Sequence, residues 1–204
     1  MPAYMFILQL IIIKIYTSMT TVIYAHPYDK SFNHAVLEEV IGQLDAEFKP
    51  YSILDLYADG FNPALDASSL RLYSRGESAD PLVDKYLQAL TDADRVIMIF
   101  PIWWAMMPAI IKGFFDKVML TGTAYKYTDA GQLVPDKINV QKTLLFTTSQ
   151  SDTETFRQFF EGYFKKNILD AVGLHNAEWY NCDKTAHGPA ENRDRFLSLV
   201  REKV

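Results

Sequence analysis

Three short stretches of polar and aromatic residues carry the side chains that could do chemistry. The first, residues 25–33, reads AHPYDKSFN, and His26, Ser31 and Asn33 in it can donate hydrogen bonds to an anion. A helix beginning just after Ser31 would add free N–H groups and the positive end of its dipole, which favour a phosphate. The same residues also fit a capped helix beside a surface histidine, and residue types alone favour that plainer interpretation.

This stretch lacks the two glycine-rich patterns that most often hold nucleotide phosphates. It has no GxGxxG spacing, which disfavours a dinucleotide-binding dehydrogenase loop. It also has no glycine pattern ending in Lys-Ser or Lys-Thr, so it is not a P-loop. A phosphate site in this stretch would therefore be of another kind.

The second stretch, residues 100–108, reads FPIWWAMMP and places Trp103 beside Trp104. Large aromatic side chains in a loop could wall a planar, electron-poor ring system, with backbone N–H groups meeting the heteroatoms of that ring. Alternatively, both indoles simply cover the helix that follows. Their position in a loop favours ligand contact for at least one of them.

The third stretch, residues 147–150, reads TTSQ and follows an apolar run. Short polar side chains and free backbone amides at the end of a strand can donate to a ring carbonyl or to a phosphate. Taken alone, this stretch is better interpreted as an ordinary turn. It is a candidate part of a site because it follows a predicted strand, as the other two stretches do.

Apolar runs that alternate with helical patterns must position these stretches. Strands are predicted at residues 21–25, 51–56, 95–100, 143–148 and 176–180, and helices after Ser31 and at residues 81–90, 108–120, 156–172 and 189–203. This alternation predicts an α/β fold with a parallel, doubly wound sheet, in which ligands bind at the carboxyl ends of the strands. The three stretches follow the first, third and fourth strands, so they should meet there.

Two connections are long. Residues 61–79 are predicted to form a loop with one helical turn. Residues 121–136 contain Gly122, Gly131 and several polar residues, which indicates a long loop or a small hairpin. Long loops in compact domains are often functional, so the second connection is a candidate part of the site.

Composition limits the classes of protein. The 204 residues are 49% hydrophobic, which suits one domain with a substantial core, and the net charge of −5 comes without a Lys/Arg cluster, which disfavours nucleic acid as a partner. Cys182 is the single cysteine, so it forms no internal disulfide and no multi-cysteine metal site. We interpret it as a packed, unreactive thiol, and we expect a cytoplasmic location and no bound metal.

Residues 1–18 are expected to be an extension to a domain formed by residues 19–204. Residues 5–16 read MFILQLIIIKIY, which is shorter than the roughly 20 apolar residues that span a bilayer and lacks the flanks of a signal peptide. They could reflect a mis-assigned start, or form an added strand or helix on the surface. A membrane-associating segment is the less favoured interpretation, and no integral membrane span is expected.

From Met19 onward the ordered motifs resemble the NAD(P)H quinone oxidoreductase family of flavodoxin-like flavoproteins, including its bacterial general-stress members. The residues that carry the resemblance are His26-Pro27, Ser31-Phe32-Asn33, residues 100–104 (FPIWW) and residues 108–116 (PAIIKGFFD). The resemblance implies a three-layer, flavodoxin-like sandwich with a five-stranded parallel sheet of strand order 2-1-3-4-5.

The resemblance also implies roles for single residues. Side chains of the first stretch would bind the flavin phosphate, those of the second would line the isoalloxazine ring, and the third would meet the polar edge of the ring. Tyr125 and Tyr127, after Gly122, would reach the substrate pocket across a dimer interface. The implied flavin-binding residues are His26, Ser31, Phe32, Asn33, Pro101, Ile102, Trp103, Trp104, Thr147 and Thr148.

The implied activity is a ping-pong transfer of two electrons from NAD(P)H through the flavin to a quinone or similar acceptor. FMN is favoured because the chain is short beside the FAD-binding relatives, and FAD is the alternative. The sequence departs from the family at Ser149-Gln150, where relatives often carry Gly-Gly, and it lacks the Tyr and His expected within residues 151–156. The acceptor is therefore left open.

Two other functions fit the same fold. An electron-carrier flavodoxin is disfavoured by the modest net charge and by the His26-Pro27 loop, since such carriers are strongly acidic and use a hydroxyl- and glycine-rich loop. A regulatory subunit of a potassium-efflux system is the second alternative, and nothing in the residues themselves excludes it.

Overall fold

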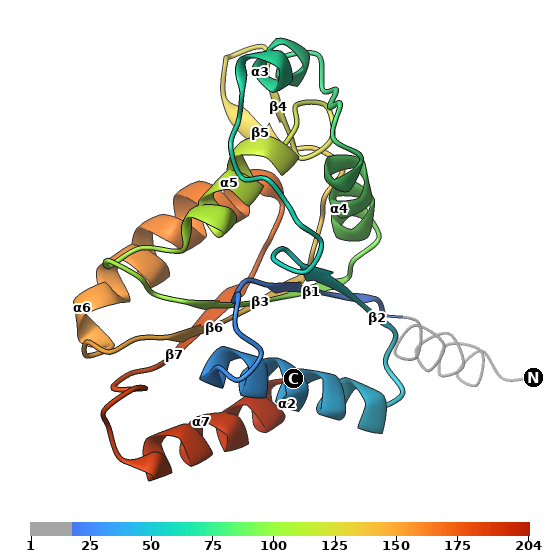
Figure 1. Cartoon of the computed structure of the whole chain (residues 1–204). Coiled ribbons are helices and arrows are strands. Elements are labelled where there is room, and N and C mark those ends of the chain that lie inside the picture. The colour runs from blue at the N-terminus through green and yellow to red at the C-terminus, as the bar shows by residue number, and fades with distance from the viewer. Residues whose placement is uncertain (1–17) are drawn as a thin grey trace, which may run out of the picture.

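A computed structural model of the chain describes residues 18–204 (Figure 1). All but the last residue of the expected extension, residues 1–18, lie outside the described residues. Among the helices that are described, none combines the length and the apolar composition needed to cross a bilayer.

A five-stranded parallel sheet forms the centre of the molecule. Its order is β2-β1-β3-β6-β7, and its strands are β1 (Thr20–Tyr24), β2 (Tyr51–Asp55), β3 (Arg95–Pro101), β6 (Lys142–Thr148) and β7 (Ala177–Cys182). Every residue of β3 is buried, as its apolar run predicted for a central strand. The prediction of a five-stranded parallel sheet in an α/β fold is therefore confirmed. The predicted strand order, 2-1-3-4-5, counts only the strands of this sheet. A separate hairpin of two strands lies between its third and fourth strands in the sequence.

Helices cover both faces of the sheet, which gives three layers (Figure 1). The helices α2 (Phe32–Ala46) and α7 (Ala190–Lys203) contact each other and cover one face. The helices α4 (Pro81–Thr91), α5 (Ala109–Val118) and α6 (Glu154–Arg157), with the π-helical segment η1 (Gln158–Leu169), lie on the other. Alternation along β1 explains the two cores, because Val22 and Tyr24 join one and Ile23 joins the other.

Local signals place the helix starts where the sequence predicted them. Ser31 caps α2, and its side-chain oxygen accepts from the N–H of His34 at 3.1 Å. Asp80 caps α4 in the same way, and Pro81 occupies the first helical turn. The first of these caps matters most for function, since it opens the N-terminus of α2 toward the loop after β1.

Two connections differ from simple loops. The prediction of a loop with one helical turn at residues 61–79 is wrong in part, because Asp66 caps a seven-residue helix, α3 (Ala67–Tyr73). The connection at residues 121–136 contains the antiparallel hairpin of β4 (Tyr125–Tyr127) and β5 (Leu133–Pro135), which confirms the hairpin interpretation.

The long aromatic stripe after β6 forms three helical pieces. It runs through α6 and η1 into the short helix η2 (Asp170–Val172) and ends at Gly173, with φ of 80°. A Cβ on Gly173 would lie 1.9 Å from the carbonyl oxygen of Ile138, so only glycine fits this turn. From this stripe, Phe160 stacks on Trp179 of β7 with ring centroids 5.1 Å apart, which anchors η1 on the sheet.

Candidate functional site

The three stretches singled out in the sequence meet at the carboxyl edge of the sheet. Asn33, in the first turn of α2, donates from Nδ2 to Oγ1 of Thr148 at 2.9 Å. The backbone N–H of Ile102 donates to the carbonyl of Thr148 at 2.7 Å. His26 packs against Trp103 with ring centroids 5.8 Å apart. The loops after β1, β3 and β6 therefore form one continuous surface.

His26 presents a defined donor at this surface. Its Nδ1 lies 3.1 Å from the backbone nitrogen of Tyr28, which can donate to it, and 3.2 Å from the carbonyl of the same residue. Burial holds the pKa of His26 below its ordinary value, so the ring is neutral near pH 7. The contact with the Tyr28 N–H is the shorter of the two, so we assign Nδ1 as the acceptor and the proton of the neutral ring to Nε2, which leaves an N–H donor.

Asn33 lies in the first turn of α2, directly after the loop that follows β1. Asn33 is only 3% exposed, and within residues 18–204 its Oδ1 has no hydrogen-bond partner. A buried acceptor without a donor is costly, so this oxygen points to a missing partner with a hydroxyl or N–H group. Phe32, also of the first turn of α2, packs against Phe196 of α7, which fixes the start of the helix.

The tryptophans sit at a tight turn. Trp103 and Met106 exchange two backbone hydrogen bonds, at 2.9 and 3.1 Å, around Trp104 and Ala105. Trp104 (φ 52°) and Ala105 (φ 61°) are both left-handed, as in the turns that suit β-hairpins. Trp104 is 99% exposed and Trp103 is 41% exposed, so Trp104 does not cover α5, and the alternative that both do is wrong.

The same turn limits which amides could meet a ring. Pro101 and Ile102 are buried, and the N–H groups of Ile102 and Trp103 already donate to Thr148 and Met106. Within the described part of the chain, the N–H of Trp104 makes no hydrogen bond. The N–H groups of Ala105 and Met107 also make none there, so three amides of this loop are free for a ligand.

The hydroxyl groups of the two threonines at the end of β6 differ in whether they are free to bind a ligand. Thr147 is fully buried, and its hydroxyl accepts from Nε1 of Trp179 at 2.8 Å and donates to Oδ1 of Asn181 at 2.9 Å. Its hydroxyl is therefore used inside the protein. Thr148 accepts from Asn33, which leaves its own hydroxyl proton available.

Tyr125 and Tyr127 lie apart from these loops in a single chain. Their rings are 5.8 Å apart on the hairpin, and the hydroxyl of Tyr125 lies 3.5 Å from that of Tyr73 in α3. Tyr73 in turn donates to the carbonyl of Met119, and burial raises the pKa of Tyr73. Figure 1 shows the hairpin beside α3. Tyr127 is 62% exposed, so it is accessible to a second molecule.

Sequence reasoning missed a cavity of about 370 Å³ that begins at His26. Tyr24, Asp29, His34, Asp55 and Tyr57 are among its lining residues. The hydroxyl of buried Tyr24 has no hydrogen-bond partner within residues 18–204. No sequence motif indicates this cavity, because its residues come from two strand ends, the turns that follow them and the first turn of α2.

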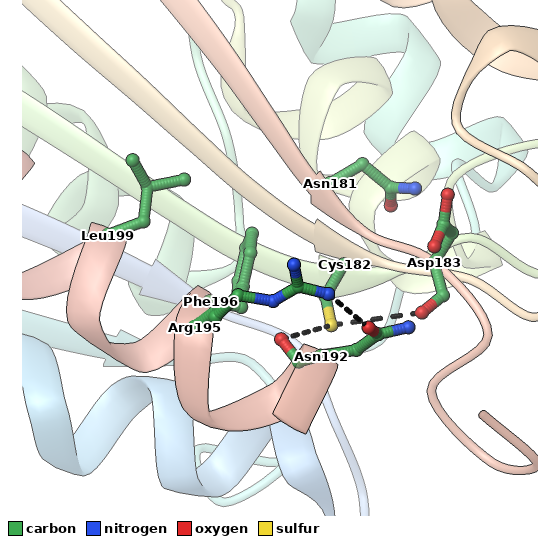
Figure 2. Close-up of a pocket in the computed structure, with 7 residues that line it drawn as sticks. All are labelled: Asn181, Cys182, Asp183, Asn192, Arg195, Phe196 and Leu199. Atoms are coloured by element: carbon green, nitrogen blue, oxygen red, sulfur yellow. Dashed lines mark hydrogen bonds between the residues drawn. The ribbon is translucent and has the colours of Figure 1, made fainter. Parts of the chain in front are cut away.

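A second missed cavity lies between the end of β7 and the start of α7 (Figure 2). It measures about 240 Å³, and Asn181, Cys182, Asn192 and Arg195 are among its lining residues. Burial is the largest cause that raises the pKa of the Cys182 thiol to about 11. The thiol is therefore protonated near neutral pH, as expected for a packed, unreactive cysteine.

Known proteins match this chain along its length. A family model described as flavodoxin-like fold matches residues 18–203. An uncharacterized NAD(P)H oxidoreductase, YcaK, of Escherichia coli is 31% identical over 195 residues, covering 89% of this chain and 94% of that protein. An FMN-dependent NADH:quinone oxidoreductase of Stenotrophomonas maltophilia is 24% identical over 172 residues, 84% of each chain.

A solved structure shows the same fold. The NAD(P)H:quinone oxidoreductase from Methanothermobacter marburgensis superposes with a TM-score of 0.79 at 24% identity, covering 91% of this chain and 96% of that one. At this identity, the likeness bears on the fold. The family model and the relative from Escherichia coli match the chain by sequence over nearly the same residues. This chain therefore belongs to the NAD(P)H quinone oxidoreductase family of flavodoxin-like oxidoreductases.

Proposed function

We propose that the chain binds FMN across the three loops and passes two electrons from NAD(P)H to a quinone or a similar acceptor by a ping-pong mechanism. The observation that carries this proposal is the junction of Asn33, Thr148 and Ile102, which joins the three loops around an unpartnered, buried oxygen. Bound FMN would supply the chemistry of accepting a hydride and passing on two electrons.

The residues present fit such a cofactor. The phosphate would lie at the N-terminus of α2, where free N–H groups, the hydroxyl of Ser31 and the Nε2–H of His26 can all donate. The unpartnered Oδ1 of Asn33 needs a donor, and a hydroxyl of the sugar-alcohol chain would satisfy it.

The ring would lie against the second loop. Trp103 packs against His26 and is partly exposed, so its indole could form a wall of the ring site. The free N–H of Trp104 and the hydroxyl proton of Thr148 are donors for the polar atoms of the ring. Pro101 and Ile102 would contribute their backbone, and so would Thr147, because its hydroxyl is used inside the protein.

The loop also bears on the order of the reaction. Since Trp104 is exposed, the outer face of the bound ring would be open to solvent. One planar molecule can then leave before the next one stacks in the same place. This is the arrangement that a ping-pong mechanism requires, with stacking geometry in place of a nucleophile.

Tyr125 and Tyr127 would act in the site of a second copy. Their hairpin lies away from the three loops of its own chain, yet Tyr127 is exposed. We therefore propose a homodimer in which these phenols hydrogen-bond the acceptor oxygen. We also propose a cytoplasmic location, which the single protonated thiol of Cys182 suits.

Titration of the full chain with FMN and with FAD tests the cofactor, because quenching of flavin fluorescence reports binding. Saturation by one FMN per chain, with weaker FAD binding, is the expected result. FMN that binds without any turnover of NADH or NADPH with a quinone would favour the carrier or regulatory function. No binding of either flavin would contradict the proposal.

A further inference from the structure

The loop that follows Thr148 is tied at several points to the end of β7 and to the residues that follow that strand. The N–H of Ser149 donates to the carbonyl of Cys182 at 2.9 Å. Its own carbonyl accepts from Thr185, through both the backbone and the side chain, each at 3.0 Å. Two further contacts tie Gln150 Oε1 to the N–H of Ala186 at 3.2 Å and Asp152 to Lys184 at 2.9 Å.

Asn181 stands at the centre of these contacts. Its Oδ1 accepts from Thr147, and its Nδ2 donates to the hydroxyls of Ser149 at 2.9 Å and Thr153 at 3.0 Å. Thr153 in turn donates to Asp183, from its hydroxyl and from its backbone N–H, both at 3.1 Å. One carboxamide thus joins the last residues of β6 to both ends of the loop.

These contacts account for the two side chains that replace the glycines of relatives. Ser149 donates to the carbonyl of Ser151 and accepts from Asn181, while Gln150 is engaged by Ala186. Both side chains are therefore bound on the β7 side of the loop. Within residues 18–204, the N–H groups of Gln150 and Ser151 make no hydrogen bond.

We propose that Asn181 is a positioning residue that fixes residues 149–153, so that the amides of Gln150 and Ser151 stay available to the polar edge of the ring and to the acceptor. The inference rests on the proposed function for its effect on turnover. The fixing of the loop stands apart from that function, because every contact that carries it lies inside the apoprotein.

Asn181→Asp is the direct test. The substituted side chain keeps the size and the oxygen that accepts from Thr147, but it loses the two N–H donors and adds a negative charge near Asp183. Asn176→Asp is the matched control. Asn176 precedes the same strand at its opposite end, and its Nδ2 donates to the carbonyl of Gln141.

Amide hydrogen exchange of the apoprotein gives the first measurement. Asn181→Asp should raise exchange at the Ser149 and Thr153 amides by about tenfold, the scale of losing one or two hydrogen bonds, while Asn176→Asp should leave them unchanged. Unchanged exchange in Asn181→Asp would overturn the inference. This readout needs no flavin, so it decides the positioning claim even if the chain binds none.

Steady-state kinetics of the FMN-loaded chain give the second measurement. Asn181→Asp should raise KM for a quinone by about fivefold to tenfold while the FMN Kd changes less than about threefold, because the phosphate end is untouched. Thr153→Val should behave like Asn181→Asp, and Thr153→Ser should restore wild-type values. A raised exchange rate with an unchanged KM would overturn the effect on turnover, whereas failure of the wild-type chain to bind flavin would overturn the proposed function alone.

Discussion

Asn33 and Thr148, 115 residues apart in the sequence, share a 2.9 Å hydrogen bond that joins the first turn of α2 to the end of β6. The bond holds the proposed phosphate loop against the proposed ring edge. It also leaves one oxygen of Asn33 and one hydroxyl proton of Thr148 free for a ligand.

Substitution at this junction should weaken FMN binding. Asn33→Leu removes both the bond and the unpartnered oxygen, so we expect the FMN Kd to rise at least about tenfold, the effect of losing roughly 1–2 hydrogen bonds. Thr148→Val should weaken binding in the same direction and Thr148→Ser should not. Fluorescence titration measures the Kd. Wild-type affinity in Asn33→Leu would place the cofactor elsewhere.

The pKa of His26 predicts a pH dependence of stability. Because burial lowers this pKa from its ordinary value of 6.5, the folded state binds fewer protons than the unfolded state between the two values. Stability from this group is therefore fully present above about pH 6.5 and is lost as the pH falls toward the lower, folded value.

Urea unfolding of the wild type and of His26→Gln at pH 7.5 and at pH 5 measures this contribution. The wild type should lose more stability between these pH values than His26→Gln does. Since the comparison is between two chains that differ at one residue, contributions from the rest of the protein cancel. Equal losses in the two proteins would show that the imidazole is not held in its neutral form.

Much of this arrangement could be predicted from the sequence. The position of Ser31 before a helical pattern identifies it as a cap. The five consecutive apolar residues within β3 indicate a central strand. Both signals are local. The loops after three strands could be placed at one edge because parallel strands share a direction.

Long-range side-chain contacts could not be predicted. Asn181 lies on a short strand with no motif, and its role depends on partners 28 to 34 residues away. The engagement of the Thr147 hydroxyl by Trp179 has the same origin. The left-handed turn at Trp104 was also hidden, because neither Trp nor Ala favours a positive φ.

That turn predicts an order of stabilities. Trp104→Gly and Trp104→Ala both remove the indole, but only glycine adopts the positive φ freely. We expect Trp104→Gly to be more stable than Trp104→Ala by about 1 kcal/mol, measured by urea unfolding. The opposite order would show that residue 104 does not adopt the left-handed conformation.

The proposed sharing of tyrosines between two copies predicts complementation. Tyr127→Phe chains and Asn33→Leu chains should each turn over a quinone slowly. Once mixed and allowed to exchange subunits, they should regain activity, because a mixed dimer contains one site with an intact Tyr127 and an intact Asn33. No gain on mixing, with exchange verified by mass, would mean that each chain supplies its own tyrosine or none.

Cys182 should resist alkylation. With its pKa raised to about 11, about one thiol in a thousand is ionised at pH 8, and the group is buried as well. Iodoacetamide should therefore label the native chain at least about a hundredfold more slowly than the chain in urea. Equal rates would show that the thiol is exposed, and mass spectrometry follows both reactions.

Anaerobic mixing of the FMN-loaded chain with NADPH or NADH tests the central claim most directly. The account predicts that the visible flavin absorbance bleaches with one of these reductants, and that a quinone restores it after the nicotinamide has been removed by anaerobic desalting. A flavin that stays oxidised with both reductants, or a reduced flavin that no quinone reoxidises, would contradict it.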